Sequence, residues 1–418
     1  MRSARLAELI YQSITSKVTA LAATFFLRRL VPSLVVAACA LSAPTPAAAA
    51  GRPPPSDRDV LALTGAEIAE LEGLLHADWQ SSFETKLGVG WDSNLLLSDL
   101  AKAESGFSRA SVEGLLWRPA REQQPVELIG FLSANYRRMF SSKYLPDDTE
   151  AFFQGEARWR PIPPVRLALL AQGYFLDTVL DLSTESERLS TPLRTAGFNF
   201  SAVTRWEINP HWWAEATGTV TRSDFRLIPE DYQEHQEGVR AGWQSGEGKL
   251  KLGLGVRERH RRYHERNYTT LGGRPIAGTL LRYRAPEIEA NVDKTLDWHG
   301  TWKIAGAFSQ SKNADNGSGY FNYRLSKLLA TIGWTRAPWD VQCSLGTSRY
   351  HWAEQVAGIG LDPPRRRRLD QSSTLQVTRQ LNAHWLVFLE AERECVSSND
   401  PSTGYNLTLF STGLGWKL

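Results

Sequence analysis

The stretch YNLTLFSTGLGWKL (residues 405–418) decides the fold of this chain. Large apolar side chains alternate along it with small or polar ones: Phe410, Leu414, Trp416 and Leu418 against Ser411, Gly413, Gly415 and Lys417. This period of two indicates a β-strand with one apolar face. A final strand with an aromatic residue close to its end is typical of a barrel, in which the last strand pairs with the first and removes both sheet edges. The alternative is a soluble β-sandwich that ends in a strand.

The same alternation recurs from Ser82 onward. In 126–136, Leu128 and Leu132 face one way, whereas Glu127 and Ser133 face the other. The connections between such segments are of two kinds that alternate along the chain. Seven are tight and rich in turn-forming residues: 121–125, 161–164, 209–211, 246–248, 297–300, 336–338 and 381–383. Eight are long and polar: 93–106, 141–150, 178–191, 225–234, 264–278, 311–318, 352–366 and 396–404. These connections predict an all-β protein with sixteen strands, an antiparallel up-and-down transmembrane β-barrel over residues 82–418.

Tryptophan supports a membrane barrel over a sandwich. Twelve of the fifteen tryptophans lie within a few residues of a short turn or of residue 418, all toward one end of the expected strands. Amphipathic rings gather at a membrane–water interface. We therefore predict an interface girdle made of Trp117, Trp159, Trp206, Trp212, Trp243, Trp302, Trp334, Trp339, Trp385 and Trp416.

Two strands change phase partway along their length. The apolar positions shift at Pro286 and again at Ser326. Each shift indicates either a β-bulge or a strand that continues beyond the membrane.

The region before the barrel has a different composition. Basic residues, an apolar core (30–38) and the small-residue run 47–50 predict a signal peptide over 1–50. Residues 36–39 loosely resemble a lipoprotein box, so lipidation of Cys39 is the alternative to ordinary cleavage after the small-residue run. Residues 51–81 contain a Pro-rich linker and a short helix (64–77), expected to be periplasmic or to plug the barrel. Removal of 1–50 takes the basic residues from 48 to 43 and the acidic ones from 45 to 44, so net charge gives no argument for nucleic acid. With Cys343 and Cys395 left, a disulfide framework is excluded.

Two short stretches carry a family resemblance. LGVGWDSN (87–94) is similar to the G-Y-D-S-N end of the first strand in several families of Gram-negative outer-membrane β-barrels, with Trp91 in place of Tyr. Residues 405–418 resemble the C-terminal β-signal that the barrel-insertion machinery reads, with Leu418 in place of Phe. These families include porin-like proteins and the barrel domains of polysaccharide or lipoprotein export proteins. The resemblance implies the cell outer membrane. We interpret Asp92-Ser93-Asn94 as a strand-ending turn with Asx hydrogen bonds.

The expected inward positions suggest a function. Sixteen strands enclose a lumen wide enough for water. Arg240 on the eighth strand and Lys251, Arg257 and Arg259 on the ninth form an expected basic wall, and Glu390 and Glu392 lie on an acidic one. Such walls can select charged solutes. The hypothesis is a porin-like channel for passive diffusion of small solutes, with anions preferred. In this channel the loops 178–191 and 264–278 are expected to narrow the lumen. The alternative is a lumen of mutually neutralising charges without selectivity.

Other functions have weaker support. An enzyme needs a nucleophile, a base and an orienting group together, and alternation puts Ser348 and His351 on opposite faces. We therefore expect no enzymatic activity and no catalytic residue. We also expect no metal and no cofactor. An export or assembly barrel for polysaccharide or surface lipoprotein is the second hypothesis, and a structural or adhesion barrel is the third. The expected partners are outer-membrane lipid, lipopolysaccharide (to which 365–368 could bind), the insertion machinery and a small solute, with a homo-oligomer left open.

Overall fold

A computed structural model describes residues 79–418, apart from 100–101, 122–124, 143–144, 182–189, 227, 229 and 359–360. The expected signal peptide, linker and helix fall in residues 1–78, which lie outside the described residues. The barrel consists of sixteen strands: β1 (Gln80–Asp92), β2 (Ser105–Arg118), β3 (Val126–Met139), β4 (Asp147–Ile162), β5 (Val165–Asp181), β6 (Ser190–Glu207), β7 (Trp212–Arg226), β8 (Tyr232–Gln244), β9 (Leu250–Tyr263), β10 (Arg282–Asp297), β11 (Thr301–Asp315), β12 (Tyr323–Arg336), β13 (Trp339–Val356), β14 (Arg365–Gln380), β15 (Trp385–Ser398) and β16 (Tyr405–Lys417).

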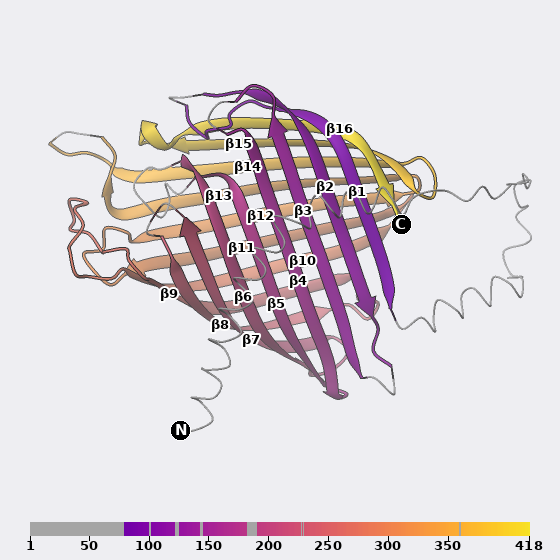
Figure 1. The fold of residues 1–418 in the computed structure, drawn as a ribbon. Helices are drawn as coiled ribbons and strands as arrows, with labels where there is room; N and C mark the ends of the chain where they lie inside the picture. The colour runs from indigo at the N-terminus through magenta and orange to yellow at the C-terminus, as the bar shows by residue number, and fades with distance from the viewer. Residues whose placement is uncertain are drawn as a thin grey trace, which may run out of the picture. The chain divides into compact units, whose positions relative to one another are not determined.

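Each strand pairs antiparallel with its neighbours in the chain, and β1 pairs with β16, so the sheet closes into a barrel (Figure 1). The predicted fold class and strand number are therefore confirmed. The predicted closure is confirmed as well, because the register of β1 and β16 runs from Glu84 opposite Lys417 to Asp92 opposite Leu409.

The connections also follow the prediction. At one end of the barrel neighbouring strands are joined by tight turns, such as the two residues between β4 and β5. We call this the short-turn end. The other connections, of which 264–281 between β9 and β10 is an example, gather at the opposite end, which we call the long-loop end. Among the described residues, helix is limited to short segments such as the 3₁₀ turn η2 (Pro401–Thr403). No described helix has the length and apolar character needed to cross a membrane.

The two faces of the sheet are identified by contacts between strands that are not neighbours. The guanidinium of Arg109 on β2 pairs with the carboxylate of Glu390 on β15, across β1 and β16. Such contacts form on the concave side of a curved sheet, so these residues define the inner face. Side chains at alternate positions of each strand then belong to the outer face.

The outer face carries a band of large apolar side chains. Every strand except β3 contributes at least one that is exposed, for example Leu254 on β9 (70 % exposed), Leu345 on β13 and Leu414 on β16. Polar and charged side chains fill most of the inner face. The molecule is therefore apolar outside and polar inside, which reverses the arrangement of a soluble protein.

Glycine makes the closing seam possible. A Cβ atom on Gly413 of β16 would lie 2.0 Å from the carbonyl oxygen of Leu87 on β1, and one on Gly88 would lie 2.5 Å from that of Thr412. Phe388 of β15 covers Gly88 on the inner face. Only residues without a Cβ let β1 and β16 approach this closely.

The predicted β-bulges at Pro286 and Ser326 are wrong. The register between β9 and β10 continues through Pro286, and that between β11 and β12 continues through Ser326. The apolar phase changes because Tyr283, Leu325 and their neighbours are buried on the inner face near the long-loop end, under the loops. The second interpretation, a strand that continues beyond the apolar band, fits this arrangement. Register shifts occur instead between Trp159 and Ile162 and between His351 and Val356.

Candidate functional site: the lumen and its long-loop mouth

The first part of the predicted basic wall lies beside an aromatic ring. Arg240 donates to Glu215 Oε1 from Nη2 at 2.8 Å, and its guanidinium lies 5.2 Å from the ring centroid of Trp213. Arg205 lies over the same ring at 4.1 Å. Glu215 is directly opposite Arg240 in the β7–β8 register. Cross-strand pairing therefore neutralises Arg240 within the wall.

The arginines of β9 are paired in the same way. Arg257 donates to Glu287 Oε1 at 2.6 Å, and its Nη2 lies 3.6 Å from the carboxylate of Glu289. Arg259 Nε lies 3.9 Å from Glu234, a carboxylate that Arg261 contacts at 2.7 Å. These acids come from the two flanking strands β8 and β10. Strand pairing thus surrounds the basic strand with acidic side chains.

Lys251, the last member of the predicted basic wall, is exposed on the inner face. It lies nearest the short-turn end of β9, opposite Asp293 in the β9–β10 register. Its ammonium group is therefore accessible from the lumen.

The predicted acidic wall is also compensated at one position. Glu390 accepts from Arg109, and its Oε1 lies 4.0 Å from Lys86 Nζ. Glu392 follows on the same face of β15 and is half-buried. The lumen therefore contains a network of paired charges rather than two walls of opposite sign.

The turn after β1 has the geometry that the sequence predicts. The backbone N–H of Asn94 donates to Asp92 Oδ1 at 2.9 Å, and the Asn94 side-chain amide donates to the carbonyl of Asn406 at 3.0 Å. Asn94 is fully buried. The Asp-Ser-Asn stretch therefore holds the first long loop against β16.

This first loop (93–104) packs inside the barrel, which the sequence did not predict. Leu95 is buried against Phe107 of β2, Met139 of β3 and Val179 of β5. Leu97 packs against the inner-face residues of β15 and β16, among them Tyr405. Because these partners come from separated parts of the wall, the loop lies across one side of the mouth.

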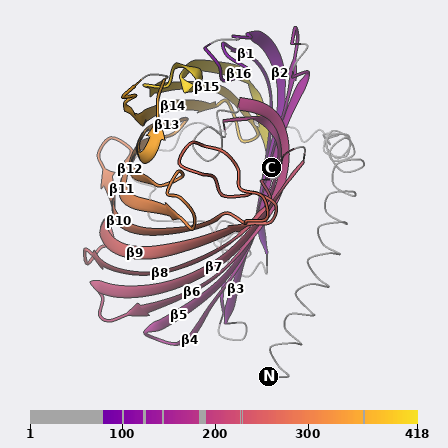
Figure 2. The ribbon, with the colours of Figure 1, turned by 90° about the vertical axis from the view of Figure 1, so that its left-hand side faces the viewer.

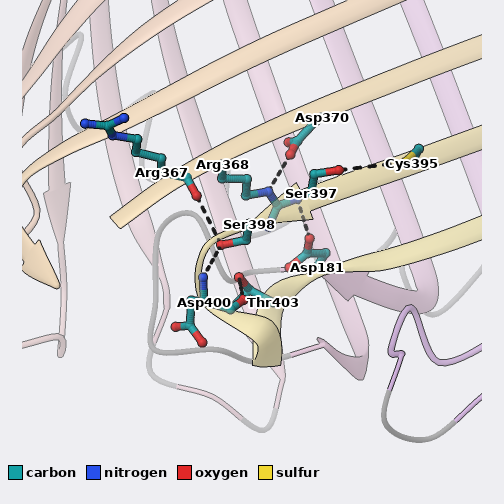
Figure 3. Close-up of polar contacts among 9 residues, drawn as sticks. All are labelled: Asp181, Arg367, Arg368, Asp370, Cys395, Ser397, Ser398, Asp400 and Thr403. Carbon is teal, nitrogen blue, oxygen red and sulfur yellow. Dashed lines mark hydrogen bonds and ion pairs between the residues drawn. The ribbon is translucent and has the colours of Figure 1, made fainter. Parts of the chain in front are cut away.

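The end of β5 extends across the mouth. Arg368 Nη2 on β14 donates to Asp181 Oδ2 at 2.6 Å, although β5 and β14 are seven strands apart around the ring. Arg368 Nε donates to Asp370 as well, so one guanidinium joins two carboxylates (Figure 3). The Arg368 side chain is 3 % exposed. The predicted constriction by 178–191 has support only from this described end of β5, since 182–189 lie outside the described residues.

The loop 264–281 lies over the opposite side. Figure 2, a view onto the long-loop end, draws it across part of the opening. Arg266 lies between the rings of Tyr263 and Phe321, 5.0 and 4.6 Å from their centroids, and its Nη1 donates to Glu230 Oε2 at 2.8 Å. The rings of Tyr232, Tyr263 and Tyr283, on the neighbouring strands β8, β9 and β10, form a row that ends on Phe321, and this row supports the loop.

The run 365–368 is divided by strand alternation. Arg366 and Arg368 point inward and are buried, where Arg366 donates to Gln355 at 2.9 Å and lies over the Trp352 ring. Arg365 and Arg367 are exposed on the outer face. Only half of the run is therefore accessible to an outside partner.

The predicted girdle tryptophans lie near the short-turn end. Exposed examples on the outer face are Trp206 (56 %) and Trp385 (47 %), and Trp302 and Trp334 pack together with ring centroids 6.1 Å apart. Trp117 differs from the prediction because it lies on the inner face, where its Nε1 donates to Glu127 Oε1 at 2.8 Å. The outer-face members are Trp159, Trp206, Trp212, Trp243, Trp302, Trp334, Trp339, Trp385 and Trp416.

Ser348 and His351, the pair considered for catalysis, lie on opposite faces of β13 in the register. Within the described part of the chain, no group of three or more His, Cys, Asp or Glu side chains is placed to hold a metal ion.

Comparisons with known proteins yield structural likeness only. No protein-family model and no curated protein matches the chain. Among solved structures, OccAB1 of Acinetobacter baumannii is similar with a TM-score of 0.43 and 9 % identity over 82 % of this chain and 96 % of that one. OpdK of Pseudomonas aeruginosa has a TM-score of 0.38 and 10 % identity over 81 % and 99 %. A bacterial polysaccharide outer membrane secretin has a TM-score of 0.39 and 9 % identity, over 80 % of this chain and 97 % of that one. These values are low, so the description of the barrel rests on its own strand order and register.

Proposed function

We propose that this protein is a porin-like channel of the cell outer membrane, through which small polar solutes diffuse passively. The observation that carries the proposal is the reversed polarity of the closed barrel, with exposed leucines outside and paired charges inside. In hydrocarbon every backbone N–H and C=O needs an internal partner, and a closed barrel supplies one. An exposed apolar band that surrounds the barrel has no comparable role in water.

The orientation follows from the two ends. In outer-membrane barrels the short turns face the periplasm and the long loops face outward. We place the short-turn end and its tryptophans at the periplasmic interface on this basis. Export across the inner membrane by the signal peptide 1–50, and recognition of β16 by the insertion machinery, belong to the same proposal, as does association into a homo-oligomer.

Solute selectivity follows from the charge network. The anion preference expected from Arg240, Lys251, Arg257 and Arg259 is reduced by the acids that neutralise three of them, and Lys251 keeps an exposed ammonium group. We propose a small anion preference and a solute class limited mainly by size and polarity. The first loop and the end of β5 would set the size limit at the mouth.

An experiment on the outer face tests the membrane location. Leu254→Arg places a charge in the middle of the exposed row on β9 (Leu252, Leu254 and Val256), and this should cost about 2–4 kcal/mol of folding stability in a bilayer. In water, substitution of an exposed leucine changes stability by less than about 0.5 kcal/mol.

Leu329→Arg is the matched control, because Leu329 is also exposed (49 %) but lies on the inner face of β12. Urea unfolding in phosphatidylcholine vesicles should show a loss for Leu254→Arg that is much larger than that for Leu329→Arg. Equal small effects would contradict the membrane location.

The alternatives give different results in a transport assay. An export or assembly barrel would pass its substrate only with partner proteins, and a structural or adhesion barrel would pass none. Swelling of vesicles that contain the purified protein in small sugars or amino acids should therefore occur for the proposed channel alone.

A further inference from the structure

Basic residues gather on the outer face of one half of the barrel, beyond the apolar band toward the long-loop end. Arg324 lies on the same face of β12 as the exposed Leu328 and four residues from it, which is about 13 Å along a strand. Lys312 stands in the same relation to Phe308 on β11. The exposed residues of this region, which we call the basic belt, are Arg262, Arg282, Arg284, Lys312, Arg324, Arg349, Arg365 and Arg367.

The register places like charges side by side within this belt. Lys312 is directly opposite Arg324, and Arg262 is directly opposite Arg282. On the next strands Arg324 is opposite His351, which is opposite Arg367. A row of basic side chains thus crosses the four strands β11 to β14 at one height. Like charges directly opposite one another destabilise a sheet unless another group compensates them.

Acidic side chains compensate only the margins of the belt. Glu258 pairs with Arg284 and lies 3.6 Å from His260, and Arg365 Nη1 lies 3.1 Å from the Glu354 carboxylate. On the outer face of β11 to β14, the strand positions two residues before or after the central row are Gln310, Ala314, Ser326, Arg349, Ala353, Arg365 and Leu369, none of which is acidic. The central row therefore has no carboxylate beside it on these strands.

The other half of the barrel differs at the same height. There Arg138 of β3 is opposite Asp147 of β4, Arg194 of β6 pairs with Asp177 of β5, and Arg222 pairs with Asp224 on β7. Each of these three outer-face arginines thus has an acid nearby, whereas Arg226 of β7 lies opposite Arg194 in the register. Outside β9–β14, exposed outer-face arginines such as Arg226 and Arg393 are isolated, whereas on β9–β14 they form a continuous group, which points to a ligand on that half.

We propose that the basic belt binds the phosphate groups of a phosphorylated lipid in the outer leaflet, with the acyl chains against the apolar band below. The proposal rests on the proposed membrane location. One face of the sheet presents both kinds of group that such a lipid needs. Guanidinium groups bind phosphate oxygens in bidentate fashion, and the exposed Leu328 and Phe308 lie about 13 Å away along the strands, toward the short-turn end. The belt would replace the divalent cations that otherwise bridge neighbouring phosphates.

The test compares two lipids and two triple variants of the full-length protein. The protein is folded into phosphatidylcholine vesicles that contain either diphosphorylated lipid A or the same lipid A without its phosphates, in buffer free of divalent cations. The belt variant is Lys312→Gln, Arg324→Gln and Arg367→Gln. The control variant is Arg138→Gln, Arg194→Gln and Arg222→Gln, which removes equal charge from the half with matched acids. The measurement is the urea concentration at the midpoint of unfolding, with tryptophan fluorescence as the signal.

Phosphorylated lipid A should raise the midpoint of the wild type and of the control variant, and added salt should reduce this rise. The belt variant should lose most of the rise, and in phosphate-free vesicles it should be at least as stable as the wild type, because like-charge contacts are removed. A rise that is equal in the belt variant, or one that does not need the phosphates, would overturn the proposal. Failure of the wild type to insert into any vesicle would refute the membrane location itself, and with it the role of the belt.

Discussion

Substitution of Gly413 by alanine should open the closing seam between β1 and β16. The new Cβ would lie 2.0 Å from the carbonyl oxygen of Leu87 and 2.6 Å from the Cα of Gly88, both backbone atoms. A carbon and an oxygen need roughly 3.3 Å, so the strands must separate by about 1.3 Å. A backbone hydrogen bond near 2.9 Å that lengthens by that much is broken.

The energetic cost follows from the groups left unpaired. Each buried backbone group without a partner costs about 1–3 kcal/mol. Loss of two such groups would cost about 2–6 kcal/mol, a large part of the ~5–15 kcal/mol that stabilises a typical domain. The variant should therefore unfold at a lower urea concentration, and its β1–β16 amides should exchange hydrogen faster than those of the β8–β9 pair.

Gly155→Ala on β4 is the matched control, because a Cβ at Gly155 meets nothing within 4 Å. Alanine is favoured over glycine in a strand interior by about 0.5–1 kcal/mol, so this variant should be unchanged or slightly more stable. The reasoning is refuted if Gly413→Ala is as stable as the control, or if its loss of protection is spread evenly around the barrel.

Three further predictions concern the lumen. Arg368→Gln should release the end of β5 from β14, since breaking a buried pair costs about 3–5 kcal/mol. The rate of vesicle swelling should therefore rise. Arg366→Gln is the control and should leave the rate unchanged, because Arg366 contacts Gln355 and Trp352 on the neighbouring strand β13. Glu234→Gln removes the carboxylate between Arg259 and Arg261 and should shift the reversal potential toward anions; an unchanged potential would show that this site does not affect the ion path. The double variant Arg257→Gln and Arg259→Gln should shift it toward cations. A unit charge ~10 Å from the ion path contributes about 0.4 kcal/mol in water, roughly a twofold change in local ion concentration before screening, so these recordings belong at low salt.

Local patterns in the sequence were sufficient for the fold. A period of two and two kinds of connection depend on neighbouring residues only, and they determined strand number, closure and the faces of Arg257, Glu390 and Leu254. The error at Pro286 and Ser326 arose because apolar residues that pack under loops on the inner face look the same in sequence as a change of face. Trp117 was assigned to the girdle by its distance from a turn, although its odd-numbered position on β2 places it inside with Arg109.

The lumen was less predictable because its contacts depend on register and on curvature. Glu215 and Glu287 neutralise the basic wall from neighbouring strands, and their alignment with Arg240 and Arg257 follows from pairing that the sequence does not specify residue by residue. The contact between Arg368 and Asp181 joins residues 187 positions apart on opposite sides of the barrel. No local pattern could identify it.

The central claim is that the polar interior of this barrel is a water-filled path through a membrane. Single-channel recording of the purified full-length protein in a planar bilayer tests it most directly. We predict discrete, stepwise conductance with weak ion selectivity. The conductance should increase when Arg368 is replaced by glutamine. Protein that is inserted and folded, as judged by its resistance to urea, but that gives no conductance in either form would contradict the account.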